Sequence, residues 1–411
     1  MKLRRGATGL WGSARGTGRR AYVLGDVDLV AALGAAGVPC VPVVHRGDPA
    51  AFSRFAVASL ERPDPSEDGR ALVERLLSWA GREALRPLLY YGNDADLLLV
   101  SRHRAELATA FDFVVPDAGL VEDLTDKARF QALARAKGLP VPAARHLDPA
   151  DGPPTAADEL TFPVVVKPLT RQGLRMLGSD AKATQFASRE ELGRAWPALA
   201  AAGVHLLAQE LVPGPESAIS SYHAYVDAEG EVVAEFTGVK IRTDPPQFGH
   251  STALRVSDDP EVLRSGREVV HTVGLRGVVK ADYKRGPDGR LSLLEVNPRF
   301  SLWHHLGAAA GVNLPAVVHA DLTGRPRPLT RARPGATWCH PWEDRWATRQ
   351  AGLSTARWLL WAARCDARTG ADWHDPMPFL RGMLLPALTN RPGRHDPRPA
   401  PVPVGRPGPA S

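Results

Sequence analysis

The sequence predicts an α/β protein whose second part changes to an α+β arrangement. Between residues 21 and 120, apolar segments such as AYVLG and RPLLYYG alternate with helical segments, which is typical of a parallel sheet. Further along, two pairs of apolar segments are joined by the turn sequences AEG and GPDG, which indicate hairpins. The 411 residues suffice for two or three packed units.

The first unit is expected over residues 21–122. AYVLG and VPCVPVV are its first strands, DVDLVAALGAAG is the helix between them, and RPLLYYG and FDFVVPD are later strands. Its first turn lacks the GxGxxG pattern, so a dinucleotide site of that kind is not supported. Asp94 follows a strand, where α/β sheets bind ligands, although a helix N-cap is an equal alternative.

The second unit is expected over residues 123–330. A helix beginning in EDLTDKARF ends at Gly138, and FPVVVKP is an apolar strand that ends at Lys167. The segment TRQGLRMLG is expected to be a short loop with two glycines that folds over phosphates. By itself this pattern is a weak signal of phosphate binding. HLLAQELVPG is a strand running into a turn, and DPEVLRSGREVVHTVG is a helix between the two hairpins.

The basic excess of the chain lies at its ends. Residues 1–20 carry a net charge of +6 and residues 391–411 carry +3, so the remainder is slightly acidic. A nucleic-acid-binding domain usually shows its basic excess on the domain itself, so no nucleic-acid partner is expected. We expect disordered ends over 1–20 and 389–411, the latter rich in proline, and a Trp-rich helical extension over 331–388.

Cysteine usage and hydropathy indicate a cytoplasmic protein. Cys40, Cys339 and Cys365 are far apart and lack metal or redox spacing, which suits free thiols in a reducing compartment. No apolar run reaches the length of a membrane span, and the N-terminus lacks the apolar core of a signal peptide. No membrane partner is therefore expected.

The stretch LSLLEVNPRF places polar side chains on one face of a strand. Glu295, Asn297 and Arg299 are spaced two residues apart. If the preceding turn has two residues, Asp282 lies opposite residue 293 or 295 and joins that face. Two carboxylates and an amide oxygen suit magnesium, which takes one or two carboxylates plus substrate phosphates. On this geometry alone, a solvent-facing strand with ordinary polar residues is an equal alternative.

Four cations extend this pattern. Lys127 opens a helix and Lys167 ends an apolar strand. A lone lysine at a strand end is usually a solvated tip, but two of them together with a metal cluster indicate a polyphosphate ligand. Lys240 and Arg242, two apart in FTGVKIR, add positive charge to one strand face.

Two aromatic segments have simpler interpretations. His304 and His305 follow the predicted metal strand, and such histidines more often cap or pack a helix than touch substrate. The segment WCHPWEDRWATR is expected to pack the C-terminal extension onto the core.

The order of TDK, FPVVVKP, QELVPG, YVDAEGEVV, GVKIR and VVKADYKRGPDGRLSLLEVNPR resembles the ATP-grasp superfamily. In detail it is similar to the predicted carboxylate–amine ligase and carboligase branch, which includes D-aspartate ligases. The resemblance covers about residues 120 to 325, and the preceding unit looks like the pre-ATP-grasp domain. It implies a Rossmann-like domain followed by a two-lobed ATP-grasp domain with a hinge near 210–214.

The resemblance implies ATP and Mg²⁺ as cofactors, with Mn²⁺ as an alternative metal. The implied nucleotide contacts are Lys127, Lys167, Gln209, Glu210, Leu211, Val212 and Glu216. The lysines would contact phosphates, the 210–212 backbone would read adenine, and Glu216 would hold the ribose. The implied metal ligands are Asp282, Glu295 and Asn297. Arg299 would stabilise the transferred phosphoryl group, and Lys240 and Arg242 would face the same intermediate or the carboxylate.

The implied reaction joins a small carboxylate to an amine, from an amino acid or peptide, through an acyl phosphate with release of ADP and phosphate. Two alternatives stay open. One is a carboligase-like enzyme that activates bicarbonate or another carboxylate. The other is an ATP-binding regulatory protein with impaired catalysis, suggested by the glycine-poor phosphate loop and by Lys280, a cation that could compete with metal near Glu295. A homodimer is also left open.

Overall fold

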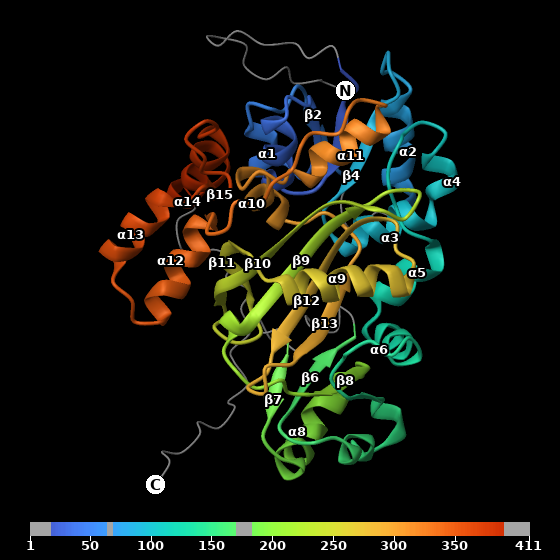
Figure 1. Cartoon of the computed structure of the whole chain (residues 1–411), viewed down its shortest axis with the longest axis vertical. Coiled ribbons are helices and arrows are strands. Elements are labelled where there is room, and N and C mark those ends of the chain that lie inside the picture. The colour runs from blue at the N-terminus through green and yellow to red at the C-terminus, as the bar shows by residue number, and fades with distance from the viewer. Residues whose placement is uncertain (1–17, 64–68, 170–182, 390–411) are drawn as a thin grey trace. The chain divides into compact units, whose positions relative to one another are not determined.

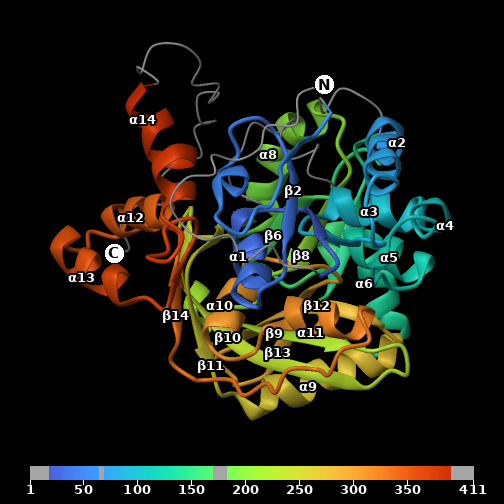
Figure 2. The same cartoon turned by 90° about the horizontal axis from the view of Figure 1, so that it is seen from above.

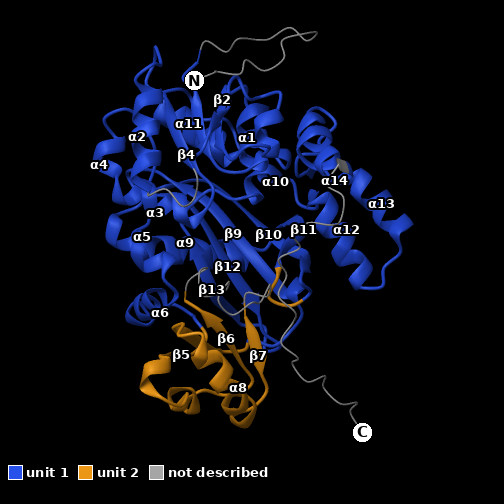
Figure 3. Ribbon diagram, turned by 180° about the vertical axis from the view of Figure 1, so that it is seen from behind, with its two compact units in different colours: residues 1–141, 212–246, 250–389 blue, residues 142–211, 247–249, 390–411 orange. Residues whose placement is uncertain are grey.

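The computed structural model describes residues 18–63, 69–169 and 183–389 (Figure 1). The chain forms two compact units (Figure 3). Unit 1 comprises residues 1–141, 212–246 and 250–389, and unit 2 comprises 142–211, 247–249 and 390–411. This division keeps 21–122 in one unit with most of 123–330, and the expected domain boundaries stay a prediction.

The first sheet of unit 1 is four-stranded and parallel, in the order β3-β2-β1-β4. Its strands are β1 (Ala21–Leu24), β2 (Cys40–Val44), β3 (Leu60–Glu61) and β4 (Leu88–Tyr91). The helices of this region are α1 (Val27–Ala35), α2 (Gly69–Ala80), α3 (Asp94–Arg102), α4 (Arg104–Leu107), α5 (Ala118–Thr125) and α6 (Lys127–Ala136). The α/β class and the parallel arrangement are thereby confirmed.

Two expectations for this region need correction. The segment FDFVVPD is not a strand, because it pairs with β4 only through an isolated bridge between Asp112 and Leu88. The Tyr91 hydroxyl donates to the Val114 carbonyl at 2.6 Å, so this acceptor is bound by a side chain instead of a strand ladder. Order also begins before residue 21, because Arg19 pairs with Asp112 and Arg20 pairs with Glu83 at 3.0 Å.

The second sheet of unit 1 has seven strands in the order β13-β12-β9-β10-β11-β14-β15. Its strands are β9 (Ile219–Val226), β10 (Val232–Asp244), β11 (His250–Ser257), β12 (Gly277–Arg285), β13 (Leu291–Asn297), β14 (Thr337–Cys339) and β15 (Ala367–Arg368). Neighbours are antiparallel except β14 and β15. Both expected hairpins, β9–β10 and β12–β13, are present.

Helices cover both faces of this sheet (Figure 2). They are α9 (Pro260–Val273) on one face, and α10 (Trp303–Ala309) and α11 (Leu314–Leu322) on the other. Under α9, a Cβ added at Gly266 would lie 2.2 Å from the Tyr222 ring, so only glycine permits this close approach. On the other face, Phe236 and Val278 pack with Trp303 and Leu306. The polar residues of the candidate site continue along this second face.

The β12–β13 hairpin has the expected pairing of Asp282 with Glu295, but its loop is longer than expected. Arg285 pairs with Leu291, and the Gly286 amide donates to the Arg290 carbonyl at 2.9 Å, which leaves a three-residue loop and not the assumed two-residue loop. A register shift between Asp282 and Tyr283 leaves one extra residue on β13 and compensates for the longer loop. Asp282 therefore pairs with Glu295.

The C-terminal extension contributes strands as well as helices. Beside β14 and β15 it contains α12 (Pro341–Gln350), α13 (Thr355–Arg364), a π-helical segment (Pro378–Leu384) and α14 (Leu385–Thr389). The expectation of a purely helical extension is therefore incomplete, because 337–339 and 367–368 lengthen the seven-stranded sheet. Trp338 is fully buried, as expected for packing onto the core, whereas Trp346 is 52% exposed.

In its described residues, unit 2 is a four-stranded antiparallel sheet in the order β5-β8-β6-β7 with the long helix α8. Its elements are β5 (Ala144–Leu147), β6 (Val164–Pro168), β7 (Thr184–Phe186), α8 (Arg189–Ala201) and β8 (Leu206–Glu210). Both predicted strands, in FPVVVKP and HLLAQEL, are confirmed. The loop TRQGLRMLG, most of the N-terminal segment and the proline-rich tail lie outside the described residues.

Four short 3₁₀ turns complete the described chain: Pro49–Phe52, Pro149–Asp151, Thr155–Glu159 and Glu216–Ala218. No helix in the described ranges is both long enough and apolar enough to cross a bilayer.

Candidate functional site

Neighbouring strands of unit 1 bring the predicted metal ligands together on one face of the seven-stranded sheet. Asp282 is paired with Ser221 of β9 on one side and with Glu295 of β13 on the other. One step along the strands, Lys280 is paired with Asn297 and with His223. Paired residues of antiparallel strands point to the same face, so these side chains form two adjacent rows.

Asp282 is the buried centre of these rows. Its side chain is 3% exposed. The Ser221 hydroxyl donates to Oδ1 of Asp282. Oδ2 faces two cations, with the Lys280 Nζ at 2.5 Å and the Lys240 Nζ at 3.9 Å. A buried carboxylate requires such partners, and here they are two ammonium groups and a hydroxyl.

Glu295 and Asn297 lie at the more open side of the rows. The Glu295 side chain is 56% exposed, and its Oε1 is 3.6 Å from the Lys280 Nζ. The Asn297 amide nitrogen donates to the same Oε1 at 3.0 Å. Glu295 is thus presented toward solvent beside a buried carboxylate.

Lys280 bridges the two carboxylates. Burial alone would lower the pKa of this ammonium, but Asp282 and Glu295 outweigh burial and raise the pKa above its ordinary value. The lysine is therefore charged in this environment.

Arg299 is held by two residues of the same unit that follow β4, Gly92 and Asp94. It pairs with Asp94 of α3, and its Nη1 donates to the Gly92 carbonyl at 3.3 Å. Its Nη2 lies 3.5 Å from Oδ1 of Asn297. The N-cap of α3 is Asn93, whose side chain accepts from the Asp96 amide. The helix N-cap role that was the alternative for Asp94 therefore belongs to Asn93.

Lys240 and Arg242 do not share a strand face. Lys240 pairs with Leu254 and Arg242 with Ala253, and a register shift separates the two pairs. Leu254 and Ala253 are consecutive and so point to opposite faces. Lys240 points to the Asp282 face, whereas Arg242 points to α12.

The guanidinium of Arg242 forms a bidentate pair with Asp344 of α12, with Nε at 2.8 Å and Nη2 at 2.7 Å. Asp344 is fully buried and also accepts from the Thr252 hydroxyl at 2.9 Å and the Trp358 indole at 2.7 Å. The Trp361 ring lies 4.5 Å from the guanidinium carbon. Arg242 therefore ties the extension to β10.

Lys284 is a further cation that sequence reasoning missed. It is buried two positions beyond Asp282 on β12, and its Nζ lies 3.7 Å from Oε1 of Glu216. Burial lowers the pKa of Lys284. The period of two that links Lys280, Asp282 and Lys284 was the sequence signal for it.

The remaining predicted residues lie on other elements. Lys127 is the first residue of α6, whose N-terminus is capped by the Asp126 side chain. In unit 2, the Lys167 ammonium donates to Oε1 of Gln209 at 2.8 Å, across β6 and β8. The Glu210 amide donates to the Ala143 carbonyl at 2.9 Å, and the Leu211 amide to Pro163 at 3.0 Å. Each unit thus carries part of the predicted set.

Two buried histidines behind the site were interpreted correctly as packing residues. Nδ1 of His304 accepts from the Ser301 amide at 3.0 Å, and burial together with Arg299 lowers the pKa of His304 to about 3. His305 lies between two carboxylates, with Nδ1 at 2.7 Å from Asp28 and Nε2 at 2.8 Å from Asp372. It thereby links α1, α10 and the C-terminal extension.

His305 predicts a loss of stability at alkaline pH. Burial alone would lower its pKa, but Asp28 and Asp372 raise the pKa to about 10. Because the folded-state pKa lies above the ordinary value of 6.5, the stabilisation is complete below about pH 6.5 and is lost as the pH rises toward 10.

Urea unfolding of the wild type and of His305→Gln between pH 6.5 and 10 measures this effect. The difference in free energy of unfolding should shrink by up to about 1.4 kcal/mol per pH unit. A difference that stays constant over this range would show that His305 is not charged in the folded protein.

The donor set suits one hard divalent cation only together with a ligand that brings further oxygens. Two carboxylates and an amide match the one or two carboxylates that magnesium takes from proteins beside phosphates. In the part of the chain that the structure describes, no group of three or more His, Cys, Asp or Glu side chains could hold a metal by itself. The residues therefore fit a metal–polyphosphate complex.

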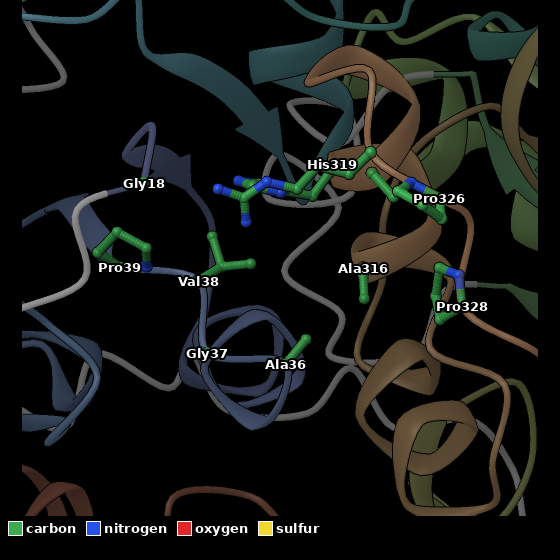
Figure 4. A pocket seen from close by; sticks show the side chains of 11 residues that line it. Gly18, Ala36, Gly37, Val38, Pro39, Ala316, His319, Pro326 and Pro328 are labelled. Atoms are coloured by element: carbon green, nitrogen blue, oxygen red, sulfur yellow. The ribbon is translucent and has the colours of Figure 1, made fainter. Parts of the chain in front are cut away.

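Two cavities of unit 1 lie apart from these rows. One, about 490 Å³ in volume, is lined by the loop that follows α1, by α11 and by the loop that follows α11, including Val38 and His319 (Figure 4). The other, about 430 Å³, is lined by His305, Arg368 and Trp373 among others. None of the predicted nucleotide or metal residues lines either cavity.

Comparison with known proteins confirms the resemblance inferred from the motifs. Residues 204–337 match the family described as ATP-grasp in the biosynthetic pathway with Ter operon. The vancomycin B-type resistance protein VanB of Enterococcus faecalis is 26% identical over 48% of this chain and 60% of its own length. The D-aspartate ligase of Enterococcus faecium is 24% identical over 57% of this chain and 58% of its own length. The chain thus spans about 60% of these relatives.

The fold is shared with solved ATP-grasp structures. The L-amino acid ligase from Bacillus licheniformis aligns with a TM-score of 0.56 and 16% identity, over 78% of each chain. Likeness at this identity concerns the fold alone. The two-lobed α/β fold class is confirmed.

Proposed function

We propose that this chain, which has an ATP-grasp fold, is an ATP-dependent carboxylate–amine ligase that forms an amide-type bond through an acyl phosphate. The observation that carries the proposal is the pairing of Asp282 with Glu295, with Asn297, Lys280 and Arg299 around them. The similarity to a D-aspartate ligase supports a ligase that uses small amine and carboxylate substrates.

In this proposal, Asp282, Glu295 and Asn297 hold Mg²⁺, or Mn²⁺ in its place. The bound ion would neutralise the ATP phosphates and favour transfer of the terminal phosphoryl group. Lys240, whose ammonium faces Asp282, would add positive charge on the same side. Arg299, fixed by Asp94, would meet the phosphoryl group as it moves to the carboxylate.

In this proposal each nucleotide contact has its own role. Lys127 and Lys167 would neutralise phosphate oxygens, and Glu216, whose carboxylate lies near Lys284, would hold the ribose. Because the Glu210 and Leu211 amides already donate to backbone carbonyls, adenine would be read by the Val212 amide and the Glu210 carbonyl. Gln209 would position Lys167 through their hydrogen bond.

The reaction follows from these roles. A substrate carboxylate oxygen attacks the γ-phosphorus, which gives an acyl phosphate and ADP. The amine then attacks the acyl carbon, and phosphate leaves. The protein positions the groups and neutralises charge, and the mechanism needs no protein nucleophile.

Two further features belong to the proposal. Arg242 contributes by anchoring the C-terminal extension to β10. The described cysteines are buried free thiols, which supports a cytoplasmic location.

The proposal is tested by product analysis. Purified protein with MgATP and paired amino acids or small peptides should release ADP and phosphate only when both a carboxylate and an amine are present. Release of AMP and pyrophosphate would reject the acyl-phosphate mechanism. ADP release with bicarbonate and no amine would favour the carboligase alternative, and ATP binding without turnover on any pair would favour the regulatory alternative.

A further inference from the structure

We infer that Lys280 is an internal cation that takes the place of a metal between Asp282 and Glu295, so that a divalent metal enters this site only together with the nucleotide. The inference rests on the proposed function, because it concerns the same carboxylates. It explains why a lysine stands inside a predicted metal site.

The geometry places the Lys280 ammonium where it contacts both carboxylates. Its Nζ lies 2.5 Å from Oδ2 of Asp282 and 3.6 Å from Oε1 of Glu295, and the side chain is only 12% exposed. Two carboxylates on paired positions of neighbouring strands repel each other unless a cation lies between them. The lysine supplies this cation and keeps both groups in place for a later ligand.

The local charge balance opposes a free metal ion. Lys280 and Lys240 both face Oδ2 of Asp282, so two positive charges already accompany the two carboxylates. A divalent ion entering alone would add two more charges and would have to compete with an ammonium that is already bound. A triphosphate reverses this balance, because it brings several negative charges and further oxygen ligands with the ion.

The displaced ammonium has a nearby acceptor. Lys280 is paired in register with His223, so both side chains lie on the same face of the sheet. His223 is fully buried against Phe236, and neither of its ring nitrogens has a hydrogen-bond partner among the residues that the structure describes. A buried imidazole without a partner is unusual, and a ring nitrogen can accept from an ammonium that leaves the carboxylate. The long flexible stem of lysine permits such a movement.

Binding of Mn²⁺, followed by its electron paramagnetic resonance signal, tests the inference without relying on turnover. Wild-type protein should bind Mn²⁺ weakly alone and at least about tenfold more tightly with a non-hydrolysable ATP analogue. Lys280→Met should bind free Mn²⁺ at least about tenfold more tightly than the wild type, whereas Lys280→Arg should not gain. Lys137→Met, at an exposed position at the end of α6, is the matched control.

Two outcomes would overturn the inference. One is wild-type protein that binds free Mn²⁺ as tightly as it does with the nucleotide analogue. The other is a folded Lys280→Met variant, checked by its thermal midpoint, that gains no affinity for free Mn²⁺. If Lys280→Met does not fold, the two wild-type measurements still decide. Absence of turnover on every substrate pair, with this binding pattern intact, would reject the proposed ligase reaction and leave the role of Lys280 standing.

Discussion

Replacing Glu295 with glutamine is expected to abolish ADP release while the thermal unfolding midpoint stays nearly unchanged. The side chain is 56% exposed and contacts the Asn297 amide and the Lys280 ammonium at the open side of the rows, and the charge of such an exposed group contributes little to the fold. In the proposed reaction, however, it holds the metal that neutralises the phosphates. We expect turnover to fall by at least about 10²–10³-fold, as is typical when a preorganised electrostatic group is removed.

The matched control is Glu229→Gln in the β9–β10 turn, an exposed glutamate outside the candidate site. It should leave both turnover and the thermal midpoint at wild-type values. The comparison uses steady-state ADP release for activity and scanning calorimetry for stability. Wild-type activity in Glu295→Gln, or a large loss of stability with proportional loss of activity, would show that Glu295 is an ordinary polar residue of a solvent-facing strand.

Much of the fold could be predicted because local sequence signals are strong in this chain. Apolar segments bounded by turn sequences located β1, β2, β4 and both hairpins. FDFVVPD failed because its apolar residues pack against the core without forming a ladder: Phe111 is fully buried, and Phe113 and Val115 are partly buried against the same core, yet the segment pairs only at Asp112. Periodicity detects burial, and it cannot tell whether the backbone also pairs.

The site was predicted less completely than the fold for two physical reasons. The register of paired strands depends on β-bulges, and no sequence pattern indicated them. The bulge on β13 restores the pairing of Asp282 with Glu295. The bulge on β10 places Lys240 and Arg242 on opposite faces of the sheet. Sequence patterns also do not show which residues far apart in the chain form ion pairs. Arg299 pairs with Asp94 across 205 residues, so only the assembled fold shows which carboxylate orients this cation.

The ion pair of Arg242 and Asp344 also joins residues far apart in the sequence, and sequence patterns did not predict it. Breaking this pair is expected to cause the largest change in stability. Asp344→Asn should lower the free energy of unfolding by about 3–5 kcal/mol, because it leaves the charge of Arg242, whose side chain is only 20% exposed, without its buried counterion. It also places an amide nitrogen among the donors of Arg242, Thr252 and Trp358. Urea unfolding at neutral pH measures the change.

The neighbouring Glu343 on α12 provides the matched control. Its carboxylate is 3.0 Å from the His250 ring, but the side chains of His250 and Glu343 are 50% and 39% exposed, so Glu343→Gln should cost less than about 1 kcal/mol. The double variant Arg242→Met/Asp344→Asn removes the unpaired charge, so it should lose less stability than the sum of the two single variants. Additive losses would show that the two residues do not act as a pair. The C-terminal extension would then be held to β10 by the packing of Trp358 and Trp361, and not by the ion pair.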